Sequence, residues 1–331
     1  MQASQPKAIP APKLCEYCGK RPPKLKRSKN GLKSCIDCFY WHFEEEIHET
    51  IMSEKLFEPG DHVLLAISGG KDSTVLVQVM TTLKERHNYP ITLELLAIDE
   101  GIKGYRDDSL VTVKNNSEFY NLPLKILSYK DLFGFTMDEV VKMTSIKCSC
   151  SYCGVFRRRA LDFGLVKGMG NRLYTGHNAD DLAETILMNM LRGDSFRLVT
   201  CTQAQSGKKG ELIRCKPFKY TYEKEIVFYA YHKKLEYFST ECTYAKDAFR
   251  GNLKELIKRL VNVQPGIIED IIRGAMTLEL KDSTQTPKKS TCESCGFVSS
   301  NRLCNVCKYK RQLENISSGK SKFVKLGEGD F

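Results

Sequence analysis

Short apolar runs alternate with amphipathic segments through the middle of the chain. Four runs rich in branched side chains lie at 62–67, 91–98, 122–127 and 172–176. Each run is followed by a segment whose apolar residues recur at helical spacing. Strands and helices that alternate in this way form a parallel sheet, because a helix carries the chain from each strand to the next. The pattern therefore predicts a doubly wound α/β fold.

The strand pattern ends near residue 222. Beyond it, apolar residues recur every three or four positions, first around Ile226 and Tyr229 and later around Leu253 and Leu256. This spacing predicts a helical extension of the sheet domain. A polar stretch at 281–290 then predicts a linker.

Pairs of cysteines occupy both ends of the chain. Two Cys-x2-Cys pairs can surround a single ion with four thiolates, so we expect structural zinc in each module, with rubredoxin-like iron as the alternative. His42 lies close enough to the first module to take the place of Cys38. The expected ligands are Cys15, Cys18, Cys35, Cys38, Cys292, Cys295, Cys304 and Cys307. We divide the chain into a zinc module (1–55), a nucleotide domain (56–280) and a linker with the second zinc module (281–331).

A glycine turn follows the first strand of the predicted sheet. The turn reads Ser68-Gly69-Gly70-Lys71-Asp72-Ser73 and leads into an amphipathic helix. Two glycines let the backbone bring its N–H groups to a polyphosphate at the positive end of the helix dipole, and Lys71 adds a charge. A Walker A loop would need Gly at 65 and Ser or Thr at 72, where this chain has Leu65 and Asp72. We therefore expect pyrophosphate as a leaving group, with a turn that binds no ligand as the alternative.

This motif resembles that of the PP-loop ATP pyrophosphatases. Four further blocks narrow the resemblance: AIDEGIKGYRDDS (97–109), CGVFRRRALDFG (153–164), TGHNADDLAETILMNMLRGD (175–194) and RCKPFKYTYEKE (214–225). Together with both cysteine modules they are similar to the family of cytosolic thiouridylase subunit 1 and its archaeal and bacterial relatives, the tRNA 2-thiolation enzymes. The resemblance extends from about Cys15 to Cys307.

The resemblance implies an ATP site at the carboxyl ends of the strands, where doubly wound sheets bind ligands. Asp181 could hold Mg2+ or a ribose hydroxyl, or, with Asp180, could simply favour the helix dipole. His177 could equally be a helix cap. The implied ATP-binding residues are Ala66, Ser68, Gly69, Gly70, Lys71, Asp72, Ser73, Ile98, Asp99, Arg157, Gly176, His177 and Asp181.

Six further cysteines lie between the modules. Cys150 and Cys153 precede a helix that carries several arginines, so we expect lowered thiol pKa values there. The resemblance joins them to Cys242, either as ligands of a [4Fe–4S] cluster with one open iron or as a persulfide carrier and its resolving thiol. We favour the cluster, because a two-thiol mechanism gives the third cysteine no role. We assign no role to Cys148, and expect small apolar roles in or near strands for Cys201 and Cys215.

The charge distribution predicts a polyanionic partner. Of the formal net charge of +11, residues 1–34 carry +8 and residues 281–325 carry +7. Lysines and arginines such as Lys24, Lys26, Arg27 and Lys29 could follow phosphates. The alternative is a charged tract that serves solubility or localisation. No apolar run approaches the roughly 18 residues of a membrane span, and the N-terminus lacks a secretory signal, so we expect a cytoplasmic protein.

These expectations combine into an ATP-dependent tRNA sulfurtransferase that makes 2-thiouridine, with Lys71 and the three cysteines as catalytic residues. The resemblance implies the wobble uridine of tRNAs for Lys, Glu and Gln, a second subunit of the same family, in a heterodimer or homodimer, and a ubiquitin-related thiocarboxylate protein as sulfur donor. The alternatives are a cytidine modifier that makes lysidine or 2-thiocytidine, and a non-catalytic RNA-binding subunit.

Overall fold

We describe the fold from a computed structural model, in which residues 14–144, 146–207, 211–240, 242–244, 249–280 and 290–320 are described. A six-stranded sheet has the order β5-β4-β3-β6-β8-β7. Its first five strands in that order run parallel, and β7 pairs antiparallel with β8 at the edge. The strands are β3 (His62–Ala66), β4 (Thr92–Asp99), β5 (Leu124–Ser128), β6 (Arg172–Tyr174), β7 (Gln205–Ser206) and β8 (Ile213–Cys215). The predicted doubly wound sheet is confirmed, and β7 and β8 add to the four expected strands.

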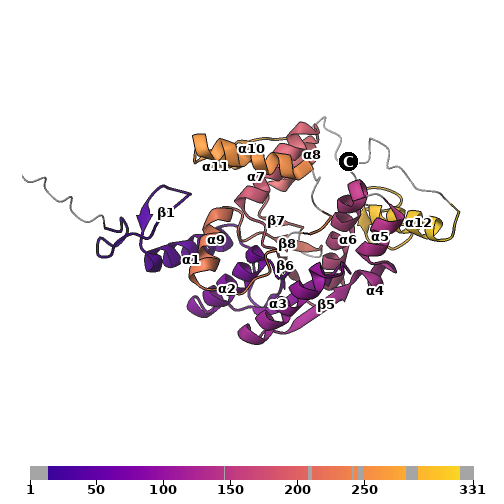
Figure 1. The fold of residues 1–331 in the computed structure, drawn as a ribbon, viewed down its shortest axis with the longest axis horizontal. Coiled ribbons are helices and arrows are strands. Elements are labelled where there is room, and N and C mark those ends of the chain that lie inside the picture. Colours follow the sequence, from indigo (N-terminus) through magenta and orange to yellow (C-terminus); the bar gives the residue numbers. More distant parts are fainter. Residues whose placement is uncertain are drawn as a thin grey trace, which may run out of the picture.

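Helices cover both faces of this sheet (Figure 1). Neighbouring residues of β3 point to opposite faces, because side chains alternate along a strand. Val63 and Leu65 belong to the core beneath α1 (Ile36–Ser53), α2 (Lys71–Arg86) and α9 (Glu223–His232), whereas Leu64 packs on the other side. The helices on that other side are α4 (Tyr129–Phe133), α5 (Met137–Met143), α6 (Ile146–Val166) and α12 (Asn305–Ser317).

A third group of helices forms the upper part of the molecule in Figure 1. Helix α7 (Ala179–Leu191) packs against α10 (Phe249–Val263) and α11 (Ile267–Met276) through a separate apolar cluster that includes Ile186, Ile257 and Ile272. Helices α10 and α11 belong to the helical extension predicted after residue 222, whereas α7 precedes it in the chain. Helices α3 (Tyr105–Tyr120) and α8 (Ser195–Cys201) complete the described helices.

Two small hairpins carry the terminal cysteine modules. Strands β1 (Leu25–Lys26) and β2 (Lys33–Ser34) form one, and β9 (Ser290–Thr291) and β10 (Val298–Ser299) form the other. Phe39 and Phe43 of α1, just beyond the first module, are buried in the central core. The expected linker at 281–290 lies outside the described residues except for Ser290, and the division at residues 55 and 280 stays a prediction.

Candidate active site

The glycine turn lies at the point where the strand order reverses. It joins β3 to α2, and the chain after β6, the neighbour of β3 on the other side, lies against it. Ligands of doubly wound sheets bind at such a switch point. The turn is held by its own serines: the Ser68 N–H donates to Ser73 Oγ at 3.1 Å, and the Ser73 hydroxyl donates to the Gly70 carbonyl at 2.9 Å. The turn is therefore ordered by contacts within itself.

Gly69 is the position in the turn where a side chain cannot fit. Its φ of +83° lies in the left-handed region that favours glycine. A Cβ atom there would meet the carbonyl oxygen of Ser109 on α3 at 2.6 Å, well inside van der Waals contact. The turn thus passes against the backbone of α3 and depends on glycine for both reasons.

Lys71, the first residue of α2, forms two ion pairs. Its ammonium lies 3.0 Å from the Asp72 carboxylate and 2.8 Å from that of Glu223 on α9. Burial disfavours the ammonium charge, but these two carboxylates outweigh it and raise the pKa of Lys71 above its usual value. Lys71 is therefore charged and held at the helix start, beside the exposed N–H groups of the turn.

The segment after β6 closes the other side of the turn. A Cβ atom on Gly176 would lie 3.0 Å from the backbone carbon of Asp72, so glycine here lets the two segments approach each other. The side-chain amide of Asn178 donates to Asp72 at 3.1 Å. The Asn178 side chain caps the start of α7 by accepting a hydrogen bond from the Asp181 N–H, and the Asp181 carboxylate accepts one from the Asn178 N–H. The helix cap is therefore Asn178 and not His177. Asp181 also accepts a hydrogen bond of 2.8 Å from Arg250 on α10.

Two titratable groups near this segment have shifted pKa values. Burial raises the pKa of Asp180 to about 6, against a hydrogen bond from the Glu223 N–H. Burial also lowers the pKa of His177, whose ring bonds the Thr175 hydroxyl at 2.8 Å. The His177 side chain is accessible to solvent yet surrounded by protein.

The carboxyl end of β4 provides the third side of the site. Asp99 accepts a hydrogen bond of 2.8 Å from the Gly101 N–H, and Ile98 is buried beside it, as Ala66 is partly buried at the end of β3. The next residue, Glu100, is 4% exposed and forms an ion pair with Arg106 at 3.1 Å. These contacts place the ends of β3 and β4 next to each other.

Arg106 connects that strand end to the glycine turn. It is 3% exposed and donates to the carbonyl oxygen of Ser68 at 2.9 Å. Glu100 also accepts a hydrogen bond of 3.0 Å from Arg157 on α6. Arg157 in turn donates to the sulfur of Cys153 at 3.4 Å. A continuous series of polar contacts therefore runs from the glycine turn to one of the predicted catalytic cysteines.

The chain beyond α9 makes a second connection between these places. The Phe238 N–H donates to the carbonyl oxygen of Gly69 at 2.8 Å. Cys242 follows four residues later, which limits its Cα to about 14 Å from that of Phe238. Cys242 and Cys153 pack against the same apolar cluster, and Cys150 lies 3.7 Å from the Tyr244 carbonyl oxygen. The structure thus brings the segment at 242–244 to the Cys150–Cys153 pair.

The expected lowering of thiol pKa values is wrong for Cys153. Helix α6 begins at Ile146, so Cys150 and Cys153 lie inside the helix and not at its positive end. Burial raises the pKa of Cys153, although the nearby Arg157 charge opposes this. The sequence shows the arginines near Cys153, but it does not show that the Cys153 thiol is buried, and burial has the larger effect on its pKa.

The remaining middle cysteines divide as follows. Cys215 is fully buried in β8, and burial raises its pKa to about 12, as expected for an apolar role. Cys201 is partly buried, but it ends helix α8 and is not in a strand. The side chain of Cys148 lies outside the described residues.

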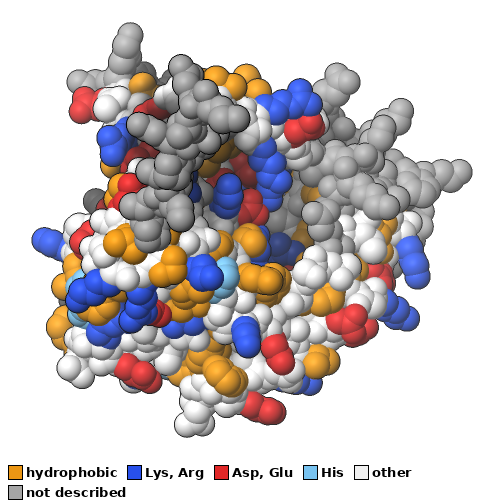
Figure 2. Space-filling view, turned by 60° about the vertical axis from the view of Figure 1, so that its left-hand side comes forward, with side chains coloured by type: hydrophobic (Ala, Val, Ile, Leu, Met, Phe, Trp, Pro, Cys, Tyr) orange, Lys and Arg blue, Asp and Glu red, His pale blue; other side chains and the backbone are white. Residues whose placement is uncertain are grey.

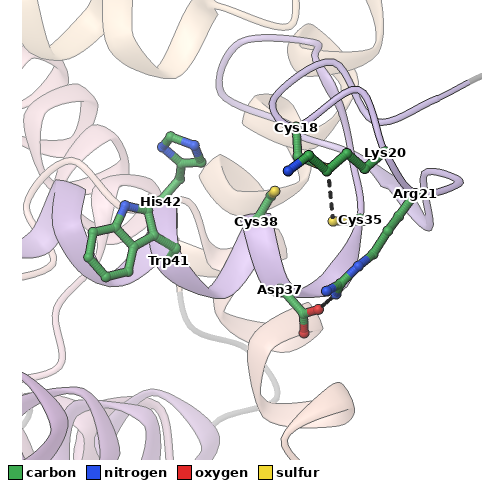
Figure 3. A pocket seen from close by; sticks show the side chains of 8 residues that line it. All are labelled: Cys18, Lys20, Arg21, Cys35, Asp37, Cys38, Trp41 and His42. Atoms are coloured by element: carbon green, nitrogen blue, oxygen red, sulfur yellow. Dashed lines mark hydrogen bonds and ion pairs between the residues drawn. The ribbon is translucent and has the colours of Figure 1, made fainter.

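The N-terminal module brings its four cysteines together, and Figure 3 shows three of them, Cys18, Cys35 and Cys38. The sulfurs of Cys15, Cys18, Cys35 and Cys38 all lie within 4.8 Å of one another. Cys38 belongs to this group, so His42 is not needed to complete it, and the His42 ring stacks on Tyr17 with centroids 4.0 Å apart. A cavity of 310 Å³ lies beside the module, between Lys20, Trp41 and His42. Four thiols at this spacing can bind one tetrahedral ion.

The C-terminal module repeats this arrangement against helix α6. Its four sulfurs, from Cys292, Cys295, Cys304 and Cys307, also lie within 4.8 Å of one another. Arg159 of α6 donates to Cys295 at 3.4 Å and lies 3.9 Å from the centre of the Phe297 ring. The rings of Tyr152 and Tyr309 approach to 4.3 Å. The module is therefore packed onto the helix that carries Cys150 and Cys153.

One of the expected phosphate-contacting residues has a different role. The Arg27 side chain is fully buried and forms ion pairs with Glu46 of α1 and Glu225 of α9, the latter at 2.6 Å. Lys29 also pairs with Glu46, at 3.1 Å. Arg27 therefore fixes the first hairpin to the core and is not available to an RNA, whereas Lys24 and Lys26 are exposed.

A third group of possible metal ligands lies on α1 and at the end of α2. Ligand atoms of Glu45, His48 and His87 lie within 4.8 Å of one another. Glu45 already pairs with Arg86 at 2.8 Å, and the two imidazole rings are stacked 3.7 Å apart and nearly parallel. Lone pairs in parallel ring planes do not converge on one ion, so this group is poorly arranged for a metal.

Several residues of the site were not singled out from the sequence. Glu100, Arg106, Asn178, Glu223 and Arg250 all contact predicted site residues. Glu100 and Arg106 stand within the block 97–109, and their burial was the missing information. In the space-filling view, charged side chains line a hollow between the part that contains α10 and α11 and the body below (Figure 2).

Comparison with known proteins agrees with this geometry. Residues 40–260 match the family model described as PP-loop domain. The chain is 52% identical over 330 residues to cytoplasmic tRNA 2-thiolation protein 1 of Oryza sativa subsp. japonica, covering 98% of this chain and 91% of the relative. The identity is 53% for the protein of that name from Arabidopsis thaliana (99% and 91% covered) and 53% for that from Schizosaccharomyces pombe (93% and 92%).

A solved structure extends the comparison to the fold. The U34-tRNA thiolase NcsA from Methanococcus maripaludis, solved with its [4Fe-4S] cluster, superposes with a TM-score of 0.77 at 28% identity. The superposition covers 91% of this chain and 96% of that one. The sequence matches and the fold therefore agree, and the chain belongs to the family of cytoplasmic tRNA 2-thiolation protein 1, within the PP-loop domain proteins.

Proposed function

We propose that the chain is an ATP-dependent tRNA sulfurtransferase that converts the wobble uridine to 2-thiouridine and forms AMP. The observation that carries this proposal is the double connection between the glycine turn and the cysteines, through Arg106, Glu100 and Arg157 and through the segment that begins at Phe238. An enzyme that activates a base and then delivers sulfur to it needs both groups beside one substrate atom.

The turn suits the first step. The C2 oxygen of the uridine attacks the α-phosphate of ATP, and the bond to pyrophosphate breaks. The N–H groups at the start of α2 and the ammonium of Lys71 stabilise the negative charge that develops on the departing pyrophosphate. The Asp72 and Asp181 carboxylates, both bonded to Asn178, provide the oxygen ligands that Mg2+ prefers.

The cysteines suit the second step. Hydrosulfide attacks C2, the bond from C2 to the adenylated oxygen breaks, and AMP leaves, so no oxidant or reductant is consumed. The carbonyl oxygen at C2 of the uracil ring is a poor leaving group, and adenylation in the first step makes it a good one. The cleft position of Arg157, accessible to solvent but surrounded by protein, suits a cation that holds negatively charged sulfur beside the base.

The donor set at Cys150, Cys153 and Cys242 fits an iron–sulfur cluster. Three thiolates that bind three different irons lie farther apart than four thiolates on one ion, so these sulfurs need not form a compact group. When bound, a [4Fe–4S] cluster would supply an open iron for sulfide. The [4Fe-4S] cluster with which NcsA was solved supports this choice over a persulfide route. The Cys150 side chain is exposed and is therefore accessible in both the cluster mechanism and the persulfide route.

The two outer modules fit structural zinc. Each brings four sulfurs within 4.8 Å of one another, which leaves no open ligand position for catalysis. A backbone N–H from Cys304 lowers the pKa of Cys292 to about 6, which favours the thiolate that a metal requires.

The proposed partners are those that the family resemblance implies. We propose tRNAs for Lys, Glu and Gln as substrates, a second subunit of the same family, and a ubiquitin-related thiocarboxylate protein as sulfur donor. Because the named relatives are called cytoplasmic, we place the chain in the cytoplasm. Across the described residues, no helix combines the length and apolar character that a bilayer crossing demands.

Nucleoside analysis of bulk tRNA tests the proposal. A strain that lacks the protein should lose 2-thiouridine derivatives. Wild-type protein and the Lys84→Ala variant should restore them, whereas Lys71→Ala should not restore them but should still bind tRNA. Unchanged 2-thiouridine, or a loss of 2-thiocytidine instead, would reject the proposal.

Metal analysis tests the cofactors separately. Anaerobically purified protein should contain iron and sulfide near cluster stoichiometry together with two zinc ions. Cys35→Ser and Cys304→Ser should each remove one zinc, and Cys201→Ser none. Active protein without iron would favour the persulfide route.

A further inference from the structure

Four cations gather beside the cysteine site, on α6, α8 and the end of β8. Arg158 and Asp162 lie one turn apart on α6, and Arg214 of β8 donates to Asp162 at 2.8 Å. Lys216 follows Arg214 by two residues, which places both on one side of the extended chain. Arg197 of α8 adds the fourth cation. Arg158 lies on the helix that carries Cys150 and Cys153, and Lys216 directly follows the last residue of β8.

Two of these cations lack a carboxylate partner. Arg214 pairs with Asp162, and Arg197 lies 3.4 Å from Asp194. Arg158 has no hydrogen bond or ion pair within the described part of the chain. The Lys216 ammonium donates only to the carbonyl oxygens of Cys201 and Gln203, at 2.9 and 3.3 Å. A carbonyl satisfies the hydrogen-bonding needs of an ammonium but does not neutralise its charge.

The cations repel one another. Burial and the charges of Arg214 and Arg197 lower the pKa of Arg158, and the Asp162 carboxylate only partly opposes them. Burial also lowers the pKa of Lys216, with Lys219 and Arg158 adding to the effect. The same field that disfavours a proton on these groups favours an anion between them.

The position of the cluster indicates which anion. The charges of Arg158 and Lys216 both act on His177, which follows Gly176, the residue that lies against the glycine turn. Arg157, the neighbour of Arg158, contacts Cys153. The turn and Lys71 already provide for the phosphates of ATP. A second anion site between the glycine turn and the cysteine-bearing helix suits a substrate with several phosphates in a row.

We propose that Arg158 and Lys216 bind a backbone phosphate of the RNA next to the reacting uridine. The guanidinium fork of Arg158 matches the geometry of a phosphate, and Lys216 provides a point charge beside it. The inference rests on the proposed function, since it names how the RNA substrate is held. It makes both residues positioning residues with no part in the chemical steps.

Salt-dependent tRNA binding by the full-length protein tests this inference. The dissociation constant for unmodified substrate tRNA is measured between low and physiological salt for wild type, Arg158→Ala, Lys216→Ala and the double variant. Each single change should weaken binding several-fold and reduce the slope of log affinity against log salt by about 0.7 to 0.9, the value for one phosphate contact. Arg158→Lys should restore part of the affinity, and Lys114→Ala, an exposed change on α3, should have no effect.

Two further measurements separate the outcomes. The KM for ATP should stay at the wild-type value in both variants, and the melting temperature should stay at the wild-type value in Arg158→Ala, because Arg158 has no hydrogen bond to lose within the described residues. Lys216→Ala loses two hydrogen bonds to carbonyl oxygens, so its tRNA affinity is compared at a temperature where the variant is folded. Wild-type slopes in both variants, or a raised KM for ATP with unchanged tRNA affinity, would overturn the inference while leaving the proposed function intact. Wild-type protein that does not bind tRNA would overturn the proposed function itself.

Discussion

Arg106 and Glu100 form an ion pair of 3.1 Å at the carboxyl end of β4, and both side chains are almost fully buried. Arg106 also holds the Ser68 carbonyl, while Glu100 also holds Arg157. One carboxylate therefore fixes two arginines, of which one supports the glycine turn and the other contacts Cys153, one of the predicted catalytic cysteines.

Replacing that carboxylate should affect stability and nucleotide binding together. Glu100→Gln leaves the buried Arg106 and the half-exposed Arg157 without this counter-charge, and the loss of one partner of a buried pair costs about 3–5 kcal/mol. We expect a lower melting temperature and weaker ATP binding by calorimetry. Glu139→Gln, which removes an exposed pair with Lys130, should cost at most about 1 kcal/mol. Equal behaviour of the two variants would contradict this role of Glu100.

Gly69→Ala should abolish nucleotide binding. The new Cβ would lie 2.6 Å from the Ser109 carbonyl oxygen, so the turn or α3 must shift. Gly134→Ala is a matched control, since Gly134 has a φ of +85° but no atom within 4 Å of its Cβ position. Both variants should lose about 1 kcal/mol of stability from the left-handed backbone, and only Gly69→Ala should lose ATP binding. ATP binding that survives in Gly69→Ala would show that the close contact with α3 is dispensable.

The raised pKa of Asp180 predicts a pH-dependent stability. A carboxyl group that titrates near 4 when unfolded and at about 6 when folded holds its proton more tightly in the folded state. Stability therefore falls as the pH rises between these values, and the full cost, at most ~3 kcal/mol, remains above pH 6. Asp180→Asn should stabilise the ligand-free protein at pH 7.5 and much less at pH 4.5.

The exposed Asp131→Asn on α4 serves as the control for that measurement. Melting temperatures at the two pH values give the comparison. An equal gain for Asp180→Asn at both pH values would exclude titration as the cause.

The buried Arg27 should behave differently from its exposed neighbour Lys26. Arg27→Ala leaves Glu46 and Glu225 facing each other and should cost about 3–5 kcal/mol in denaturant unfolding. Lys26→Ala should leave stability unchanged within about 0.5 kcal/mol and weaken tRNA binding at low salt. A stable Arg27→Ala protein with weakened tRNA binding would restore the phosphate-contacting role expected from the sequence.

The sequence predicts the parts of this molecule that depend on local pattern. The strands of 62–67 and 91–98 are found at His62–Ala66 and Thr92–Asp99, because alternating burial on two helix-covered faces leaves apolar runs. Strand β7 escaped prediction because its two residues, Gln205 and Ser206, are polar, and the three residues of β8 were not recognised although β6, which is equally short, was predicted. Both cysteine groups form as expected, since each ligand pair has a short fixed spacing.

Burial and long-range pairing explain what the sequence could not provide. Arg27 has the same charge as Lys24 and Lys26, and only its partner 198 residues away distinguishes it. Cys153 stands beside arginines in the sequence, yet its burial outweighs their effect on its pKa. The role of Glu223, which holds Lys71, depends likewise on α9 packing beside α2.

The packing of the last helix has a consequence for how the protein is made. Leu313 of α12 is fully buried in the same cluster as Tyr152 and Phe156 of the cysteine-bearing helix α6. During synthesis, α6 leaves the ribosome long before α12 does. Helix α6 therefore gains its final neighbours only at the end of translation, and a messenger truncated before codon 290 would yield a product with an open apolar surface behind Cys150 and Cys153.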